Sequence, residues 1–571
     1  MGEDEGESPG VLPVEELPAE DWPLRPWLLA GLLALAGLLI HFATDGHENE
    51  PAWMAAAAFL FFGPLCAAFS LERESWKQAA VFALLAGLVM AGLAWRAVSA
   101  GDHYADEQYG FSAGVIATVL ALPLFQAGFH RTRFATPYRD THFFVWTDAV
   151  SGAGALAFTG ISWLLLALLS QLFELLKIDL LSDLMGKGWF GWAFSGACFG
   201  AALGVLRNHL RIIGTLQSVV LLVLSLLAVP LAAGLVVFLL AMVLSGPDVL
   251  WEATRSATPV LLACAAGAFV LANAIVREDD TDMTRSPVMR AAALVLALGI
   301  LPLAVFAAVS MGTRIAQHGL SPERLWALVA IAVACAYGLA ALVAVVRGRL
   351  RGWWGILRRA NLNLAVGVSV VALFLALPVL DFGAISAANQ VSRLERGTVS
   401  AKDFDYDALR WDFGDAGRKA LAGLARSGDP AVAKRAKEAL ARKDRPWHWP
   451  AEDDRRDERL ANIHFRFEDP ALREAVRGFV RDAPYRCTEP CVALDLGRYA
   501  DGAPHLALVE GQQVTHLRRS AEGVWVEAPV QPSRIDRKQA GPKGTTPQVE
   551  VRPYAGRQIY VDGQPVGNPF E

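Results

Sequence analysis

The sequence predicts a mainly α-helical fold, namely a polytopic transmembrane bundle of about eleven spans. An extramembrane α+β domain is predicted to follow, made of a helical hairpin and a small antiparallel β module. Three observations support this fold class. More than half of the 571 residues are hydrophobic. Long apolar runs recur between residues 27 and 380, and shorter helical and then alternating patterns replace them after residue 380.

Hydrophobic residues make up 54% of the chain and charged residues only 19%, against roughly 25% charged residues in an average soluble protein. The apolar residues gather in runs of about 17 to 25, the length that crosses ~30 Å of hydrocarbon. Because a lipid-exposed backbone must satisfy its own N–H and C=O groups, these runs are predicted to be helices. The predicted spans are residues 27–43, 51–69, 79–95, 111–129, 149–169, 189–206, 219–244, 258–276, 291–311, 325–346 and 362–380.

Composition divides the chain into four regions. Residues 1–26 are predicted to be an acidic, disordered cytoplasmic tail, and residues 27–380 the bundle. Residues 381–443 are predicted to be a helical juxtamembrane region, in which "DAGRKALAGLARSGDPAVAKRAKEALARK" is typical of a hairpin similar to one HEAT-type unit. Residues 444–571 are predicted to be a small β-rich periplasmic domain. There, "HLALVEG", "QVTHLRR", "GVWVEAP", "QVEVRPY" and "RQIYVDGQPVG" alternate in polarity as strands do, and Asp562-Gly563 indicates a hairpin turn.

Lysine and arginine in short loops indicate which side of a membrane each loop faces. The N-terminal flank and every second loop carry sixteen such residues, and the intervening loops carry six. The sixteen are Arg25, Arg73, Lys77, Arg131, Arg133, Arg139, Arg207, Arg211, Arg277, Arg285, Arg290, Arg347, Arg349, Arg351, Arg358 and Arg359; the six are Arg96, Lys177, Lys187, Arg255, Arg314 and Arg324. This asymmetry predicts a cytoplasmic N-terminus. With an odd number of spans, the chain after residue 380 is then predicted to lie in the periplasm of a bacterium.

The cysteines provide an independent indication of sidedness. Four of the six lie inside apolar runs, where a thiol usually serves as a small packing residue. Cys487 and Cys491 instead occur together in "RCTEPC", within the region predicted to be external. A close pair in an oxidising compartment predicts a local disulfide. The alternative is half of a metal site, but no second Cys or His pair lies at ligand spacing nearby.

The interiors of the predicted spans contain no Asp, Glu, Lys, Arg or His. This counts against a proton-coupled pump or an ion channel with a charged filter. It leaves open a carrier with a cavity near Gln126 or Asn273 and the proline-broken helices. In the sixth span, "GACFGAALG" places Gly196, Gly200 and Gly204 on one helix face, which predicts close packing against a helix of the same chain or of a second copy.

Residues 130–150, "HRTRFATPYRDTHFFVWTDAV", are predicted to form a charged cytoplasmic loop between the fourth and fifth spans. The purely structural interpretation is that its arginines only keep the loop on the cytoplasmic side of the membrane. The functional interpretation takes Arg131, Arg139, Asp140 and His142 as a candidate site for a lipid headgroup or nucleotide. A metal site using His130 and His142 is a further alternative, although their spacing matches no metal-binding motif.

Three stretches resemble one family of bacterial polytopic membrane proteins. They are "TPYRDTHFF", "LRNHLRIIGTLQ" and, most specifically, "DFGAISAANQVSRLERGTVSAKDFDYDALRWDFGDAGRKALAGLA". Over roughly residues 80–425 the chain resembles the family named domain of unknown function 4153. The resemblance implies an inner-membrane location and no particular reaction. It also points to an acidic, calcium-like loop after the second cysteine. The matching stretch here, "ALDLGRYADGAP", retains Asp495 and Asp501 but lacks the full ligand set.

Several function classes are disfavoured by the sequence. The net charge of −5 comes without a basic stripe, so no nucleic-acid partner is expected. No phosphate loop, nucleophile elbow, zinc-protease motif or kinase motif occurs in the chain, so neither catalysis nor a cofactor is expected. The leading hypothesis is a non-catalytic inner-membrane protein that serves envelope assembly, sensing or interaction, with the bilayer and an envelope protein as partners. The alternatives are a transporter of an amphipathic or lipidic substrate and a membrane enzyme acting on lipid headgroups.

Overall fold

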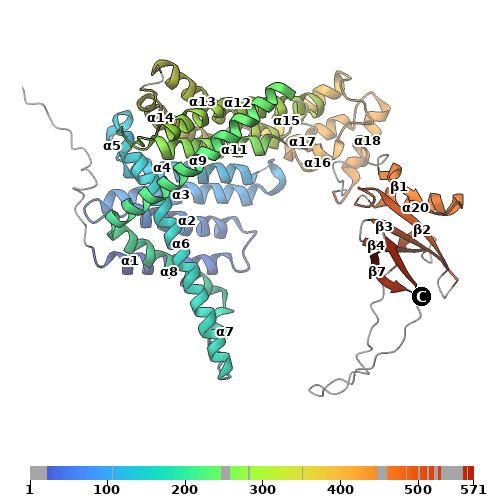
Figure 1. Cartoon of the computed structure of the whole chain (residues 1–571), viewed down its shortest axis with the longest axis horizontal. Helices are drawn as coiled ribbons and strands as arrows, with labels where there is room; N and C mark the ends of the chain where they lie inside the picture. The colour runs from blue at the N-terminus through green and yellow to red at the C-terminus, as the bar shows by residue number, and fades with distance from the viewer. Residues whose placement is uncertain are drawn as a thin grey trace, which may run out of the picture. The chain divides into compact units, whose positions relative to one another are not determined.

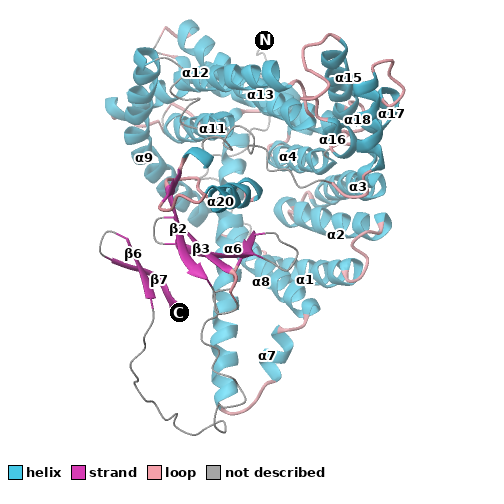
Figure 2. Ribbon diagram, turned by 90° about the vertical axis from the view of Figure 1, so that its right-hand side faces the viewer, coloured by secondary structure: helices cyan, strands magenta, loops and turns pink. Residues whose placement is uncertain are grey.

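The computed structural model of the chain describes residues 22–105, 107–245, 257–280, 283–349, 352–445, 459–483, 485–498, 502–510, 513–519, 525–528, 557–561 and 564–570. It separates into two compact units, Met1–Lys443 and Asp444–Glu571. Helices make up nearly all of the first unit, and the strands lie in the second (Figures 1 and 2). Residues 1–21 of the predicted acidic tail lie outside the described residues.

Eleven helices of the first unit are long and apolar enough to cross a membrane, which confirms the predicted fold class. Each overlaps one predicted span. They are α1 (Arg25–Thr44), α2 (Pro51–Ser70), α3 (Trp76–Ala100), α4 (Glu107–Gln126), α6 (Tyr138–Leu175), α8 (Gly188–Asn208), α9 (Leu210–Ser245), α11 (Ala257–Val276), α12 (Pro287–His318), α13 (Pro322–Arg347) and α14 (Trp353–Ala376). Short helices connect some of them, namely η1 (Gly101–His103), α5 (Phe129–Thr132), η2 (Arg133–Ala135) and α7 (Leu180–Met185).

The two ends of the bundle are named here by the helix termini that meet there. At the near end α1, α6 and α14 begin and α2, α8 and α11 end. At the far end α3, α12 and α14 end and α13 begins.

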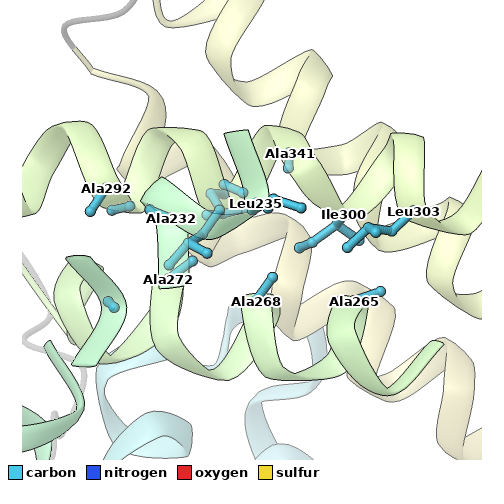
Figure 3. Packing of buried hydrophobic residues seen from close by; sticks show 14 of the residues in the cluster. Ala232, Leu235, Ala265, Ala268, Ala272, Ala292, Ile300, Leu303 and Ala341 are labelled. Carbon is cyan, nitrogen blue, oxygen red and sulfur yellow. The ribbon is translucent and has the colours of Figure 1, made fainter. Parts of the chain in front are cut away.

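Small side chains allow the helices to approach closely. Figure 3 shows Ala265 and Ala268 of α11 pointing toward Ile300 and Leu303 of α12, within an alanine-rich core shared with α9, α13 and α14. Lipid tails are as apolar as leucine, so van der Waals packing is a main source of attraction between membrane helices. Alanine increases that packing because it brings two helix backbones together.

The glycine face of the sixth span packs against α1 of the same chain. A Cβ atom added at Gly196 or Gly200 would overlap the carbonyl of Leu33 or Leu29, and one added at Gly204 would overlap the backbone of Pro26. The structure therefore places the three glycines in an antiparallel α1–α8 contact within one molecule.

Four further helices pack at the far end and are called here the far-end module. They are α15 (Phe382–Glu395), α16 (Tyr406–Trp411), α17 (Gly414–Leu424) and α18 (Pro430–Ala441). Their core contains Leu409, Leu421 and Ala436, each almost inaccessible to solvent. Asp429 begins α18 because its carboxylate accepts hydrogen bonds from the amides of Ala431 and Val432. Helices α17 and α18 are the hairpin that the sequence predicts.

The second unit contains a five-stranded sheet in the order β1-β2-β3-β4-β5 and a separate β6-β7 hairpin. The strands are β1 (Ile463–Phe465), β2 (Cys491–Arg498), β3 (Pro504–Glu510), β4 (Gln513–Arg519), β5 (Trp525–Glu527), β6 (Arg557–Val561) and β7 (Gln564–Phe570). The prediction of a purely antiparallel module is wrong in one respect, because β1 pairs with β2 in parallel. Helix α20 (Pro470–Asp482) supplies the connection that a parallel pair requires.

Three sequence features of this unit have different outcomes. The sulfur atoms of Cys487 and Cys491 lie 2.04 Å apart, as in a disulfide. Most of the described part of the stretch compared with a calcium loop is strand β2, and Asp495 lies in that strand, whereas Asp501 lies outside the described residues. The predicted strand "QVEVRPY" and the turn at 562–563 lie outside the described residues.

Two histidines pair inside this sheet. His505 of β3 and His516 of β4 are both buried, and His505 Nε2 lies 2.8 Å from His516 Nδ1. Burial lowers the pKa of His516 below its usual value. One ring must donate and the other accept in this hydrogen bond, so the pair is compatible with neutral imidazoles.

Candidate functional site

Residues 130–150 lie at the near end, and much of this stretch is helix rather than loop. Helix α6 begins at Tyr138 and continues without interruption to Leu175. Pro137 disfavours a helical conformation for Thr136, and Asp140 lies in the first turn, where a negative charge interacts favourably with the helix dipole. The first three turns of α6 therefore carry Arg139, Asp140, His142 and Asp148, ahead of its apolar part, whereas Arg131 and Arg133 precede the helix.

The four predicted site residues do not form one accessible cluster. Arg131 is exposed on α5 and donates a hydrogen bond to the side chain of Gln78. Arg139 is half-exposed, and its Nε lies 3.8 Å from Glu278 Oε1. Asp140 and His142 are buried. A headgroup clamp requires accessible charges, and only the two arginines meet that requirement.

A buried polar cluster joins α6, α11 and α14 at the near end. Asn361 Nδ2 donates to Asn273 Oδ1 over 2.8 Å, and Tyr138 Oη donates to the same oxygen over 3.4 Å. His142 Nδ1 lies 3.9 Å from Glu278 Oε2, beyond hydrogen-bond distance. Neither ring nitrogen of His142 nor Oε2 of Glu278 has a hydrogen-bond partner among the described residues. Such unpaired groups cost about 1–3 kcal/mol each.

The metal alternative finds no support within the described ranges. No group of three or more His, Cys, Asp or Glu side chains is arranged there to hold an ion. His130 stacks on Phe125 with ring centroids 5.0 Å apart, away from the buried cluster of His142. Desolvation, together with the charge of Arg131, lowers the pKa of His130.

The polar residues expected near a transport cavity are instead held by internal hydrogen bonds. Gln126 Nε2 donates to the carbonyl of Phe69 over 2.7 Å and to Asp148 Oδ1 over 3.2 Å. Asn273 donates to Phe269 O and accepts from Asn361. Both residues therefore help to hold near-end helices together, which leaves the transporter hypothesis without its expected lining residues.

Buried arginines cap the carboxyl ends of the helices. Arg358 donates to the carbonyls of Val276, Arg277 and Asp279 at the end of α11, and to the carboxylate of Asp280. Arg207 donates to the carbonyl of Ala68 near the end of α2. A helix leaves its last four carbonyls without partners, and a cation also interacts favourably with the negative end of its dipole. These arginines are structural.

Capping of a helix carboxyl end also fixes the far-end module to the bundle. Arg393 of α15 donates to the carbonyls of Ile315 and Ala316 through Nη1 and to that of Gln317 through Nη2. Gln390 Nε2 donates to the carbonyls of His318 and Leu320.

Asn389 completes this junction by accepting a hydrogen bond from the amide of Leu320. Every one of the last four carbonyls of α12, residues 315–318, thus has a partner on α15. These contacts come from "ISAANQVSR", part of the most family-specific stretch.

A pocket of about 520 Å³ lies between the end of α3 and the far-end module. Its lining comes from α3, η1, α16 and α17. The lining residues are Ser99, Ala100, Gly101, His103, Arg410, Trp411, Asp415 and Arg418. Sequence reasoning missed this pocket, because its two walls lie about 300 residues apart and no local motif marks either one.

Charged and aromatic side chains define the chemistry of this far-end pocket. His103 Nδ1 lies 2.7 Å from Asp415 Oδ2, and Arg418 Nη2 donates to Asp415 Oδ1 over 2.7 Å. Hydrogen bonds from Arg418 and from His103 lower the pKa of Asp415, which stays ionised. The guanidinium of Arg410 lies 5.0 Å from the ring centre of Trp411. The pocket therefore contains a carboxylate, that of Asp415, whose charge is compensated by its hydrogen-bonded neighbours. It also contains Arg410, which forms no ion pair with an acidic side chain among the described residues.

The eleven apolar helices and the separate second unit define a multi-pass membrane protein with an additional folded domain. The family model described as "Domain of unknown function (DUF4153)" matches residues 54–424. That range covers more than half of the chain, from α2 to the end of α17, so the chain belongs to this family. No curated protein and no solved structure matches it.

Proposed function

We propose that this protein is a non-catalytic component of the bacterial inner membrane that holds a binding module at a fixed position on the periplasmic face. In this proposal the near end is cytoplasmic, and the far-end module and the second unit are periplasmic. Their role is interaction with the envelope, in its assembly or in sensing its state.

The observation that carries the proposal is the junction between α12 and α15. Arg393, Gln390 and Asn389 give the far-end module a fixed position on the bundle through six hydrogen bonds. Side-chain donors that match all the terminal carbonyls of a helix restrict both rotation and separation of the two parts. A fixed module at the membrane surface suits recognition better than a flexible tether does.

Charge and sulfur chemistry support the proposed sidedness. The N-terminal flank and the loops predicted to be cytoplasmic carry sixteen of the twenty-two lysines and arginines near the predicted span ends, as cytoplasmic loops do. The Cys487–Cys491 pair belongs to the second unit, and disulfides persist in oxidising compartments such as the periplasm.

Cysteine labelling in the full-length chain tests the sidedness. Glu74→Cys, in the exposed near-end loop after α2, and Gly428→Cys, in the exposed loop between α17 and α18, form a matched pair. A membrane-impermeant maleimide applied to spheroplasts is expected to label Gly428→Cys directly and Glu74→Cys only after permeabilisation. The reverse labelling pattern refutes the proposed orientation.

Complementation tests the proposed role. A chain that ends at residue 380 keeps all eleven spans, whereas one that ends at Lys443 also keeps the far-end module. We expect the shorter chain to insert in the membrane and fail to restore the envelope phenotype of a deletion strain. If the bundle alone restores that phenotype, the periplasmic parts are dispensable and the proposal is wrong.

A further inference from the structure

We propose that the far-end pocket between α3 and the helices α16 and α17 binds the phosphate group of a small phosphate ester. The ester is either a phospholipid headgroup or a soluble molecule of the same chemistry. This inference deepens the proposed function by naming a ligand class, although the binding chemistry does not depend on which side of the membrane the pocket faces.

The charge of the lining favours an anion. Arg410 and Arg418 contribute two positive charges and Asp415 one negative charge, so the sum is +1 with a neutral His103 and +2 with a protonated one. Asp415 is already held by Arg418 and His103, which reduces its repulsion of a second anion. Arginine suits phosphate because its planar guanidinium donates two parallel hydrogen bonds.

Two nitrogen donors of the lining residues lack acceptors. Arg410 Nε and Trp411 Nε1 have no hydrogen-bond partner among the described residues. Neither atom is open to solvent in its present position, so a small movement of these side chains is needed before a ligand can reach them. A phosphate ester supplies acceptor oxygens, which complement this pair of donors.

The size of the pocket favours an ester over inorganic phosphate. About 520 Å³ lies within the 300–1,000 Å³ typical of ligand pockets and exceeds what a bare phosphate fills. The ring of Trp411 and the methyl group of Ala100 give the pocket an apolar part that can contact the carbon skeleton of the ester.

The length of α3 supports a position of the pocket at the depth of lipid headgroups. Helix α3 has 25 residues, or about 37 Å at 1.5 Å per residue, which exceeds ~30 Å of hydrocarbon. Its last residues, Ser99 and Ala100, line the pocket. Trp95 and Tyr104 are about half-exposed on either side of this position, as aromatic residues of the membrane interface are.

Calorimetry on the purified full-length protein in detergent tests the proposal with sn-glycerol 3-phosphate, inorganic phosphate and glycerol as probes. Native mass spectrometry tests retention of phosphatidylglycerol from mixed micelles. Arg410→Gln is the test variant. Arg426→Gln is the matched control, because Arg426 is an exposed arginine of the same module that does not line the pocket. Arg410→Lys keeps the charge and removes the forked geometry.

We expect one phosphate-containing probe to bind and Arg410→Gln to weaken it at least tenfold, since a charge-assisted hydrogen bond is worth that much or more. Arg410→Lys is expected to be intermediate, and Arg426→Gln to match the wild type. Binding of glycerol 3-phosphate identifies a soluble ester, and retention of phosphatidylglycerol alone identifies the headgroup.

The proposal is overturned if neither phosphate probe nor phospholipid binds, or if Arg410→Gln and Arg426→Gln bind alike. Size-exclusion profiles of the variants distinguish a lost site from a lost fold, and Arg410→Lys provides a second test if Arg410→Gln misfolds. Maleimide labelling stays independent of the pocket, so failure of the binding test leaves the proposed orientation intact.

Discussion

Replacing Arg393 by alanine tests whether the far-end module is held as the structure indicates. Arg393 is 9% exposed and donates three hydrogen bonds to carbonyls at the end of α12. Hydrogen bonds from a charged donor are worth roughly 1.5–3 kcal/mol each, and such contributions are not additive. Water at the helix end replaces part of the loss. We therefore expect the variant to lose about 3 kcal/mol of local stability at the α12–α15 junction, taking one to two of these bonds as the net loss.

Hydrogen exchange measured by mass spectrometry on the full-length protein in detergent is the assay. A loss of about 3 kcal/mol corresponds to roughly hundredfold faster exchange, because each 1.4 kcal/mol is a factor of ten. The acceleration is expected in peptides from the end of α12 and from α15, and not at the near end. Arg393→Lys is expected to give a smaller effect, because a single ammonium cannot span three carbonyls.

Arg396→Ala is the matched control for this prediction. Arg396 lies just after α15, is exposed, and donates to Ser392 O within the same helical segment. Its removal is expected to leave exchange at the junction within about twofold of the wild type, as for most surface substitutions. Equal exchange in Arg393→Ala and Arg396→Ala refutes the view that the capping bonds hold the module in place.

Three further predictions concern other parts of the chain. Gly200→Leu forces α1 away from α8 and is expected to cost about 3 kcal/mol or more, seen as loss of monodisperse protein, whereas Gly160→Leu, which meets nothing within 4 Å, is tolerated. Reducing the Cys487–Cys491 bridge is expected to destabilise the second unit by about 2 kcal/mol, from the loop-closure entropy of a short loop, measured by urea unfolding with and without reductant. The lowered pKa of His516 makes the folded sheet prefer the neutral ring. The preference for a neutral His516 ring therefore stabilises the folded sheet above pH 6.5, and this stabilisation is lost as pH falls through the folded-state pKa. Protection factors for hydrogen exchange in β3 and β4 should fall by up to about tenfold per pH unit in that window.

The sequence was informative where a single physical requirement acts on a continuous segment. Crossing hydrocarbon requires an apolar run of set length, so all eleven spans could be predicted from hydropathy. The hairpin of α17 and α18 was also predictable, because the Asp-Pro pair at Asp429 marks a helix start. The same signal, Asp469 followed by Pro470, precedes α20. That helix was missed because its sequence, "PALREAVRGFVRD", is short, charged and amphipathic.

Contacts between distant segments could not be predicted from local patterns. The glycines of α8 indicated a close helix contact, yet nothing local identifies α1 as the partner. The hydrogen bond between His103 and Asp415 joins residues 312 positions apart. The family resemblance pointed to a ligand loop in the stretch that contains Asp495, whereas pairing with β3 keeps Asp495 in the extended strand β2. Each of these features depends on tertiary contacts, which local sequence patterns do not determine.

Some arginines that were counted to predict membrane orientation also have a second, structural role. The orientation rule treats the positive charges of near-end loops as interchangeable, but Arg358 and Arg207 are buried and donate to helix carbonyls. Arg393 does the same at the far end, where the count predicts few cations. Because a carbonyl end attracts cations wherever it meets the interface, capping contributes arginines to both faces. Exposed cations such as Arg131 are free of this requirement, so they are the better indicators of sidedness. A count that uses exposed cations alone therefore excludes Arg207 and Arg358, which cap helices at the near end.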